Sequence, residues 1–143
     1  VQLAKAFNQE CVQLSNHALK FSNESEIRTE PFETGVLQLE DDSFDLVFTS
    51  PPFFDYEMYC DQNPKYVNWI DDFYKPLMIQ SCRCVKPGGK VVIYVGDTSA
   101  GAIKNFMLHT VQKITLLKFV NMIAFTGIKS NKLRGTWVYE KIN

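Results

Sequence analysis

The sequence predicts an α/β fold, in which helices cover both faces of a mostly parallel sheet and an antiparallel hairpin follows at the C-terminal end. Three observations predict it. Short apolar runs typical of buried strands alternate with longer segments in which apolar residues recur at helical spacing. Turn-forming prolines and glycines separate these segments. The last two strand-like runs have no helix between them. We therefore expect a three-layer sandwich around one sheet.

The N-terminal part is expected to form an amphipathic helix. Apolar residues recur at helical steps from Val1 to Phe21, with polar residues between them: Leu3, Ala4, Phe7, Cys11, Leu14, Ala18 and Phe21. A short polar stretch then ends the helix. Glu26 to Glu30 is compatible with a short strand, and the proline and glycine of Pro31 to Gly35 predict a loop.

The next strand is predicted at Phe44 to Thr49, where a β-prone run stops abruptly at Ser50-Pro51-Pro52. The spacing of apolar residues then predicts a helix from Tyr66 to Val85. Pro76 should kink or split this helix, because proline has no N–H and its ring obstructs the preceding turn. Lys86-Pro87-Gly88-Gly89 should end it with a breaker and a flexible turn.

The apolar run from Lys90 to Val95 predicts a central strand that is covered on both faces. Asp97-Thr98-Ser99 offers an N-cap for the following helix. The buried side of that helix is expected to comprise Ile103, Phe106, Met107, Val111 and Ile114. Leu116 to Phe125 and Thr136 to Ile142 then predict the hairpin, linked through the glycine-containing segment Gly127 to Asn131.

The composition is that of a single globular domain spanning residues 1–143. Hydrophobic residues make up 45% of the chain, which is enough to form a core. No apolar run approaches the roughly 20 residues needed to cross a bilayer, and the first residues lack a signal-peptide profile. We expect a protein without membrane association that lies inside the cell, in the cytoplasm, nucleoid or nucleus.

The cysteines give little support to a metal site. The sequence has two histidines and no CxxC pair among its cysteines, which are Cys11, Cys60, Cys82 and Cys84. We interpret them as small buried or half-buried thiols and expect no bound metal.

Charge is unevenly placed along the chain, although the formal net charge is only −1. Acidic residues crowd the first third and basic residues dominate the last. Two interpretations of the basic end stay open. Lys129, Lys132 and Arg134 either hold phosphates or belong to a solvated, lysine-rich rim.

The segment Ser50-Pro51-Pro52-Phe53 carries the clearest chemical signal. Ligands of open α/β sheets gather outside the carboxyl ends of the strands, where this segment is predicted to lie. Consecutive prolines make a rigid loop whose carbonyls can point into a pocket. A serine hydroxyl and a proline carbonyl that accept both N–H bonds of an exocyclic amine would favour its pyramidal, methyl-accepting form. Phe53 would stack on the heterocycle. The alternative is a stiff turn that only ends a strand.

These segments resemble the class I amino-methyltransferases of DNA, the N4-cytosine and N6-adenine enzymes. Their motif, in which Asp, Asn or Ser precedes Pro-Pro and an aromatic residue, matches Ser50 to Phe53. A Lys-Pro-Gly-Gly turn before a strand, here residues 86–89, is frequent in class I methyltransferases. Thr49 before Ser-Pro-Pro looks most like the N4-cytosine group. The resemblance extends from about Ile27 to the C-terminus.

The resemblance implies a Rossmann-like fold, S-adenosyl-L-methionine as the methyl donor and DNA as the partner. It implies catalytic roles for Ser50, Pro51, Pro52 and Phe53. On the cofactor side it implies Phe32 beside the adenine ring, Glu33 as an acceptor from an amino group, and Thr49. For Glu33, a solvated loop acid is the alternative.

The glycine-rich turn that holds the donor in class I enzymes has no match among the seven glycines. We expect a domain that is incomplete at its N-terminus, with this turn upstream of Val1, in unpermuted order. The alternatives are that a partner supplies the turn or that methyl transfer has been lost. No separate target-recognition domain is predicted. Two other functions stay open: a non-catalytic nucleic-acid-binding or assembly module, and a methyltransferase for RNA, a protein amide or a small molecule.

Overall fold

The computed structural model describes residues 28, 30, 32–51, 69–97, 101–125 and 134–143. The chain divides into two compact units, Val1–Gln38 and Leu39–Asn143, and each is described by itself. The predicted helix of residues 1–21 and the segment joining the last two strands lie outside the described residues. The expectation of a single domain stays a prediction.

In the first unit, Phe32–Gly35 forms the short helix α2, and Val36–Gln38 continues as a 3₁₀ turn. The sequence is compatible with a short strand at residues 26–30 and predicts a loop at 31–35. Both expectations are wrong for the described residues, since Arg28 and Glu30 lie outside any strand and the expected loop is helical from Phe32. The Arg28 guanidinium donates to the carbonyl oxygen of Gly35 at 3.5 Å. This hydrogen bond satisfies the Gly35 carbonyl oxygen at the end of α2. The spacing of apolar residues along the sequence could not reveal such a bond.

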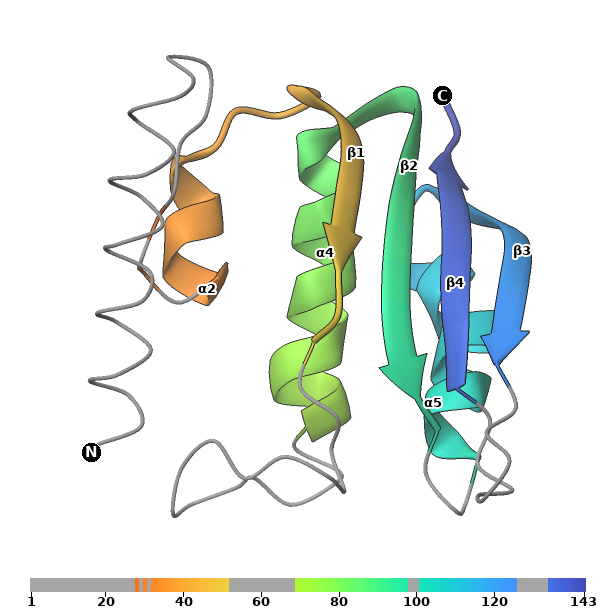
Figure 1. The fold of residues 1–143 in the computed structure, drawn as a ribbon. Coiled ribbons are helices and arrows are strands. Elements are labelled where there is room, and N and C mark those ends of the chain that lie inside the picture. Colours follow the sequence, from red (N-terminus) through yellow and green to blue (C-terminus); the bar gives the residue numbers. More distant parts are fainter. Residues whose placement is uncertain (1–27, 29, 31, 52–68, 98–100, 126–133) are drawn as a thin grey trace, which may run out of the picture. The chain divides into compact units, whose positions relative to one another are not determined.

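The second unit is built on a four-stranded sheet in the order β1-β2-β4-β3. The strands are β1 (Phe44–Thr49), β2 (Val85–Gly96), β3 (Leu117–Phe125) and β4 (Arg134–Lys141). β1 pairs with β2 in parallel, whereas β4 pairs antiparallel with both β2 and β3. The predicted C-terminal antiparallel pair is confirmed. The sheet is mixed rather than mostly parallel, because β4 returns between β2 and β3 (Figure 1).

The helix between β1 and β2 changes type at its proline. A π-helical turn, η2 (Ile70–Tyr74), leads into α4 (Lys75–Cys84), and Pro76 lies in the first turn of α4. A proline is tolerated at that position because the first helical N–H groups have no partner within the helix. The backbone is helical on both sides of Tyr74 and Lys75, so the expected kink or split at Pro76 stays a prediction.

A second helical segment joins β2 to β3. It consists of α5 (Ala102–Asn105), the π-helical turn η3 (Phe106–Thr110) and α6 (Val111–Ile114). The predicted inner side is confirmed, since four of its members are buried and Ile114 is partly buried against them: Ile103, Phe106, Met107 and Val111. Within the described ranges, none of the helices combines the length and apolarity that a bilayer-spanning segment requires.

Both helical segments pack on the same face of the sheet. The rings of Tyr74 and Phe106, one from each segment, have centroids 6.3 Å apart. Figure 1 shows α4 and α5 on one side of the strands. Alternate residues of β2 and β4 complete this core: Val91, Ile93, Val95, Trp137 and Tyr139. The Tyr139 hydroxyl donates to the Met107 carbonyl at 2.8 Å, and burial raises its pKa.

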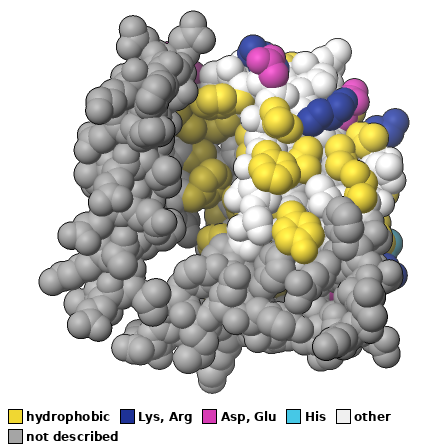
Figure 2. All heavy atoms as spheres, viewed as in Figure 1, with side chains coloured by type: hydrophobic (Ala, Val, Ile, Leu, Met, Phe, Trp, Pro, Cys, Tyr) yellow, Lys and Arg dark blue, Asp and Glu magenta, His cyan; other side chains and the backbone are white. Residues whose placement is uncertain are grey.

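The opposite face of the sheet carries exposed apolar side chains. Leu46 and Phe48 of β1 are 54% and 65% exposed, and Ile123 of β3 is 52% exposed. Figure 2 shows hydrophobic side chains gathered on this face. The described helices therefore cover one face, and the predicted cover on both faces is not confirmed.

The Lys-Pro-Gly-Gly segment belongs to β2 instead of preceding it. Phe44 pairs with Val85 but Leu46 pairs with Lys90, so residues 86–89 bulge out of the ladder. Gly88 has a φ of 80°, a conformation that side chains disfavour. A Cβ on Gly89 would lie 2.7 Å from Val85 Cγ2 and 2.9 Å from the Asp45 carbonyl oxygen. Each glycine is thus required, for a different reason.

The cysteines of the described ranges are structural. Cys82 and Cys84 are both buried and free, as expected. Burial is the main cause that raises the pKa of the Cys84 thiol. Cys11 and Cys60 lie outside the described residues. Among those described, no three His, Cys, Asp or Glu side chains gather into a possible metal site.

Candidate active site

The predicted reaction loop begins where β1 ends. Thr49 is the last residue of the strand and pairs with Ile93 of β2. Ser50 is exposed and Pro51 is buried. A buried proline fixes the direction in which the chain leaves the strand, and the serine before it faces solvent. Pro52 and Phe53, the other two predicted catalytic residues, lie outside the described residues.

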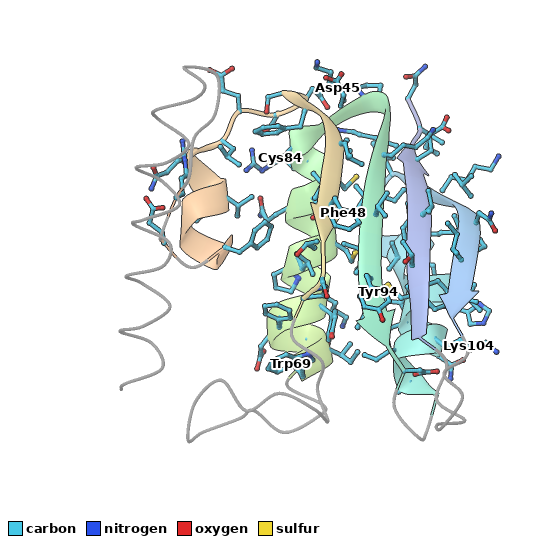
Figure 3. The ribbon with its side chains drawn as sticks, viewed as in Figure 1. Asp45, Phe48, Trp69, Cys84, Tyr94 and Lys104 are labelled. Atoms are coloured by element: carbon cyan, nitrogen blue, oxygen red, sulfur yellow. The ribbon has the colours of Figure 1, made fainter. Side chains whose placement is uncertain are left out.

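The neighbouring strand β2 extends beyond this point to Gly96, so its last residues flank the place where Ser50 leaves the sheet. Tyr94 follows Ile93, the last residue of β2 that pairs with β1. Side chains alternate along a strand, which places Phe48 and Tyr94 on the face without described helices (Figure 3). Thr49 shares the other face with Val47, which packs against the core, and is itself half-buried. The structure therefore places Thr49 toward the helices.

Asp97 organises the end of β2. Its Oδ1 atom accepts from the backbone N–H groups of Ile103 and Lys104 at 3.1 and 3.2 Å. Gly101, which precedes α5, has a φ of 69° and allows the chain to turn into the helix. The N-cap position is Gly101 and not one of residues 97–99 as expected, while Asp97 accepts from the first turn of α5 across the loop. Thr98 and Ser99 lie outside the described residues.

Sequence reasoning did not place Asp97 in the site. The available signal was a Gly-Asp pair directly after a buried strand whose carboxyl end lies beside that of β1. Parallel strands bring their carboxyl ends to one edge of a sheet. Ser50 and Asp97 therefore belong to the same edge, although they lie far apart in the sequence.

Two of the predicted cofactor-binding residues belong to the other unit. Phe32 begins α2 and is 38% exposed. Glu33 is part of the same helix, and its side chain lies outside what the structure describes. Their roles beside an adenine ring stay predictions.

Several ion pairs of the second unit lie at the opposite edge, where β1 and β2 begin. Lys86 pairs with Asp45 at 2.9 Å, and Arg83 pairs with Asp41 at 2.5 Å. The bond to Asp41 is the main cause that raises the pKa of Arg83. Lys90 pairs with Glu140 and lowers the pKa of that carboxyl. Acidic residues from the first third of the chain thus meet basic residues from later segments.

Comparison with solved structures shows which known fold this chain resembles. No protein-family model matches the chain, and no curated protein matches it. Three crystal structures of a protein from Thermus thermophilus, provisionally named a DNA modification methylase, are similar. The selenomethionine derivative aligns with a TM-score of 0.56 and 17% identity over 78% of this chain and 52% of that chain.

The second of these structures aligns with a TM-score of 0.57 and 18% identity over 80% of this chain and 53% of that chain. The third, complexed with S-adenosyl-L-methionine, aligns with a TM-score of 0.54 and 18% identity over 78% and 53%. The chain is similar in fold to this methylase. It spans about half of the methylase's length.

Polar side chains of Thr49, Ser50 and Asp97 lie where β1 and β2 end. Ser50 is exposed and Thr49 is half-buried. Oδ1 of Asp97 accepts from the backbone at the start of α5.

Proposed function

We propose that this chain carries the amine-binding side of an S-adenosylmethionine-dependent methyltransferase that acts on an exocyclic amino group of a DNA base. The target would be N4 of cytosine or N6 of adenine. One observation carries the proposal. An exposed Ser50 and a buried Pro51 follow the end of β1, in a fold similar to that of a DNA modification methylase.

The exocyclic amine is a weak nucleophile, because its lone pair is delocalised into the heterocycle. In the proposal, the Ser50 hydroxyl and the Pro51 carbonyl accept its two N–H bonds. These hydrogen bonds strengthen as the nitrogen becomes pyramidal and gains positive charge, so they stabilise the transition state more than the ground state. Pro52 holds the loop rigid, and Phe53 stacks on the base and orients it. On duplex DNA the target base must leave the helical stack.

The proposed methyl donor is S-adenosyl-L-methionine, with which one of the similar structures is complexed. It would supply an electrophilic methyl group. Phe32 and Glu33 are proposed to contact its adenine and Thr49 to support the loop beside it.

We propose that residues 1–143 belong to a larger, Rossmann-like catalytic domain. The complete sheet of that domain would be mostly parallel, and the described strands would lie at its antiparallel end. The match to about half of the methylase chain supports this view. Such an enzyme acts where DNA lies, inside the cell.

The test is Ser50→Ala in the full-length protein, with methyl transfer measured from radiolabelled S-adenosylmethionine to DNA. We expect kcat/KM to fall about 100-fold or more, because one preorganised transition-state contact is lost. Binding of S-adenosylmethionine should be unchanged.

Ser81→Ala is the matched control. The Ser81 hydroxyl is buried in α4 and has no hydrogen-bond partner among the described residues, so its removal should leave turnover unchanged. Near-normal turnover in Ser50→Ala would contradict the proposed role of Ser50. Absence of methyl transfer in the unaltered full-length protein would contradict the proposed function itself.

A further inference from the structure

A pocket that is broadly open to solvent lies between the two helical segments. Its volume is about 400 Å³. Its apolar lining comes from Ile70, Ala102 and Phe106, and its polar lining comes from Lys75, Asn105, His109 and Thr110. The volume falls in the usual range for small-molecule pockets.

Every polar residue of the lining has a hydrogen-bond donor that an anion can use. Lys75 has three ammonium N–H groups, and Asn105, His109 and Thr110 each have at least one donor. No carboxylate belongs to the described lining. Asp71 contacts Lys75 Nζ from one turn earlier. Because an ammonium group has three donors, Lys75 can hold Asp71 and a second acceptor together.

The donor set suits a phosphate better than a carboxylate. A phosphate group has up to four oxygens in a tetrahedral arrangement, so it can accept from several of the four polar residues at once. A carboxylate has only two oxygens. The apolar wall of Ile70, Ala102 and Phe106 adds a surface for the sugar or base attached to a phosphate.

The backbone around the pocket is unusual as well. Ile70 opens the π-helical turn η2, and Phe106, His109 and Thr110 belong to the π-helical turn η3. Irregular turns of this kind occur frequently at functional sites. The lining residues Ala102, Asn105, Phe106, His109 and Thr110 recur at helical spacing, so they share one face of this segment.

The pocket lies toward the edge of the sheet that carries Ser50. The two helical segments follow the carboxyl ends of β1 and β2. The pocket is lined by Ile70 and Lys75 of the first segment and by residues from Ala102 to Thr110 of the second. Figure 3 shows Trp69 and Lys104, which lie near the starts of the two segments, at the same end of the sheet.

We propose that this pocket binds a phosphate group. A nucleic-acid strand whose base is presented to Ser50 is the source that its position favours, and a free phosphate or nucleotide is the other. The nucleic-acid source rests on the proposed function, whereas phosphate binding does not.

The experiment titrates the full chain, labelled with ¹⁵N, with inorganic phosphate and separately with a short single-stranded oligonucleotide, at constant ionic strength. Phosphate should shift the amide signals of Lys75, Asn105, His109 and Thr110 with saturation. Lys75→Met should weaken binding about tenfold, since a charge-assisted hydrogen bond is lost. Asp71→Asn should strengthen it, because the competing carboxylate is removed.

Lys104→Met is the matched control, because Lys104 is exposed on α5 but outside the lining. It should change phosphate affinity by less than about twofold. Thr110→Val provides a second variant if Lys75→Met fails to fold, which its spectrum would show. Ser50→Ala should bind phosphate as the unaltered chain does, which separates this proposal from the proposed function.

The same loss of affinity for the oligonucleotide and for phosphate in Lys75→Met would identify the nucleic-acid backbone as the source. A loss for phosphate alone would identify a free phosphate or nucleotide. Absence of saturable binding, or equal losses in Lys75→Met and Lys104→Met, would overturn the phosphate pocket.

Discussion

The two ends of the sheet differ in how their polar groups are used. At the end where β1 and β2 begin, Asp42 and Ser43 donate backbone hydrogen bonds to the carbonyls of Arg83 and Cys84, the last residues of α4. Lys141 contacts Asp42 at 2.5 Å and the Val85 carbonyl at 3.0 Å. These groups are paired with one another and hold strands and helix together.

At the other end, Ser50 is exposed beyond β1, and the proposed phosphate pocket lies between the helices. Helices that return from the carboxyl ends of parallel strands leave their loops free at that edge, where ligands bind in α/β proteins. We therefore expect substitutions among the paired groups of the first end to act on stability, and substitutions of Ser50 or of the pocket's polar residues at the second end to act on function.

The largest expected effect on stability is that of Gly89→Ala, at the paired end. A Cβ would lie within 3 Å of two backbone carbonyl oxygens and of Val85 Cγ2, and only the side chain can readily move. We expect a loss of about 2–4 kcal/mol in the free energy of unfolding, measured by urea denaturation.

Gly88→Ala is the control for Gly89→Ala. Its Cβ meets nothing within 4 Å, and its cost arises only from a φ of +80°. We expect about 1–2 kcal/mol. A larger loss for Gly88→Ala than for Gly89→Ala would contradict the described bulge.

Lys141→Met should cost about 1–3 kcal/mol. The lysine side chain is 10% exposed, and its loss leaves the Val85 carbonyl without this bond. Lys86→Met is the matched comparison, because the Lys86 and Asp45 side chains are 45% and 87% exposed. It should cost less than about 1 kcal/mol. Equal losses in the free energy of unfolding for Lys141→Met and Lys86→Met would show that burial does not determine how much each ion pair stabilises the fold.

Asp97→Ala should cost about 1 kcal/mol, since two N–H groups at the start of α5 lose their acceptor. Thermal unfolding measures the loss, and hydrogen exchange at Ile103 and Lys104 locates it. Asp97→Asn, which keeps an oxygen acceptor, should recover most of the stability. Unchanged exchange at both amides in Asp97→Ala would rule out the capping role.

The smallest effect is expected for Phe48→Thr, on the exposed face of the sheet. Phe48 is 65% exposed, and threonine keeps a high strand propensity. The free energy of unfolding should change by less than about 1 kcal/mol. A loss well above that value in chemical denaturation would mean that this face is covered in solution.

Much of the second unit could be predicted from local sequence. The strand at residues 44–49 was predicted at its observed bounds, and the helix of residues 66–85 overlaps the observed helical segment 69–84. Apolar spacing succeeded there because each segment buries one side. Tyr74 is fully buried at the same helical spacing, four residues after Ile70 and three before Leu77.

The candidate site was predicted only in part. Ser50 and Pro51 were found through a motif, because two prolines after a strand constrain the backbone whatever surrounds them. Asp97 and the pocket could not be found in that way. Their roles depend on which strand ends and helical turns become neighbours in space.

The sequence by itself determined where strands and helices form and where the rigid Ser50 loop begins, since propensity, apolar period and proline act over short distances. Tertiary structure alone decided that β4 lies between β2 and β3, that acidic residues of the first third meet Lys86, Arg83 and Lys141, and that four donors line one pocket. These features depend on strand pairing and helix packing between distant residues, which no local pattern encodes.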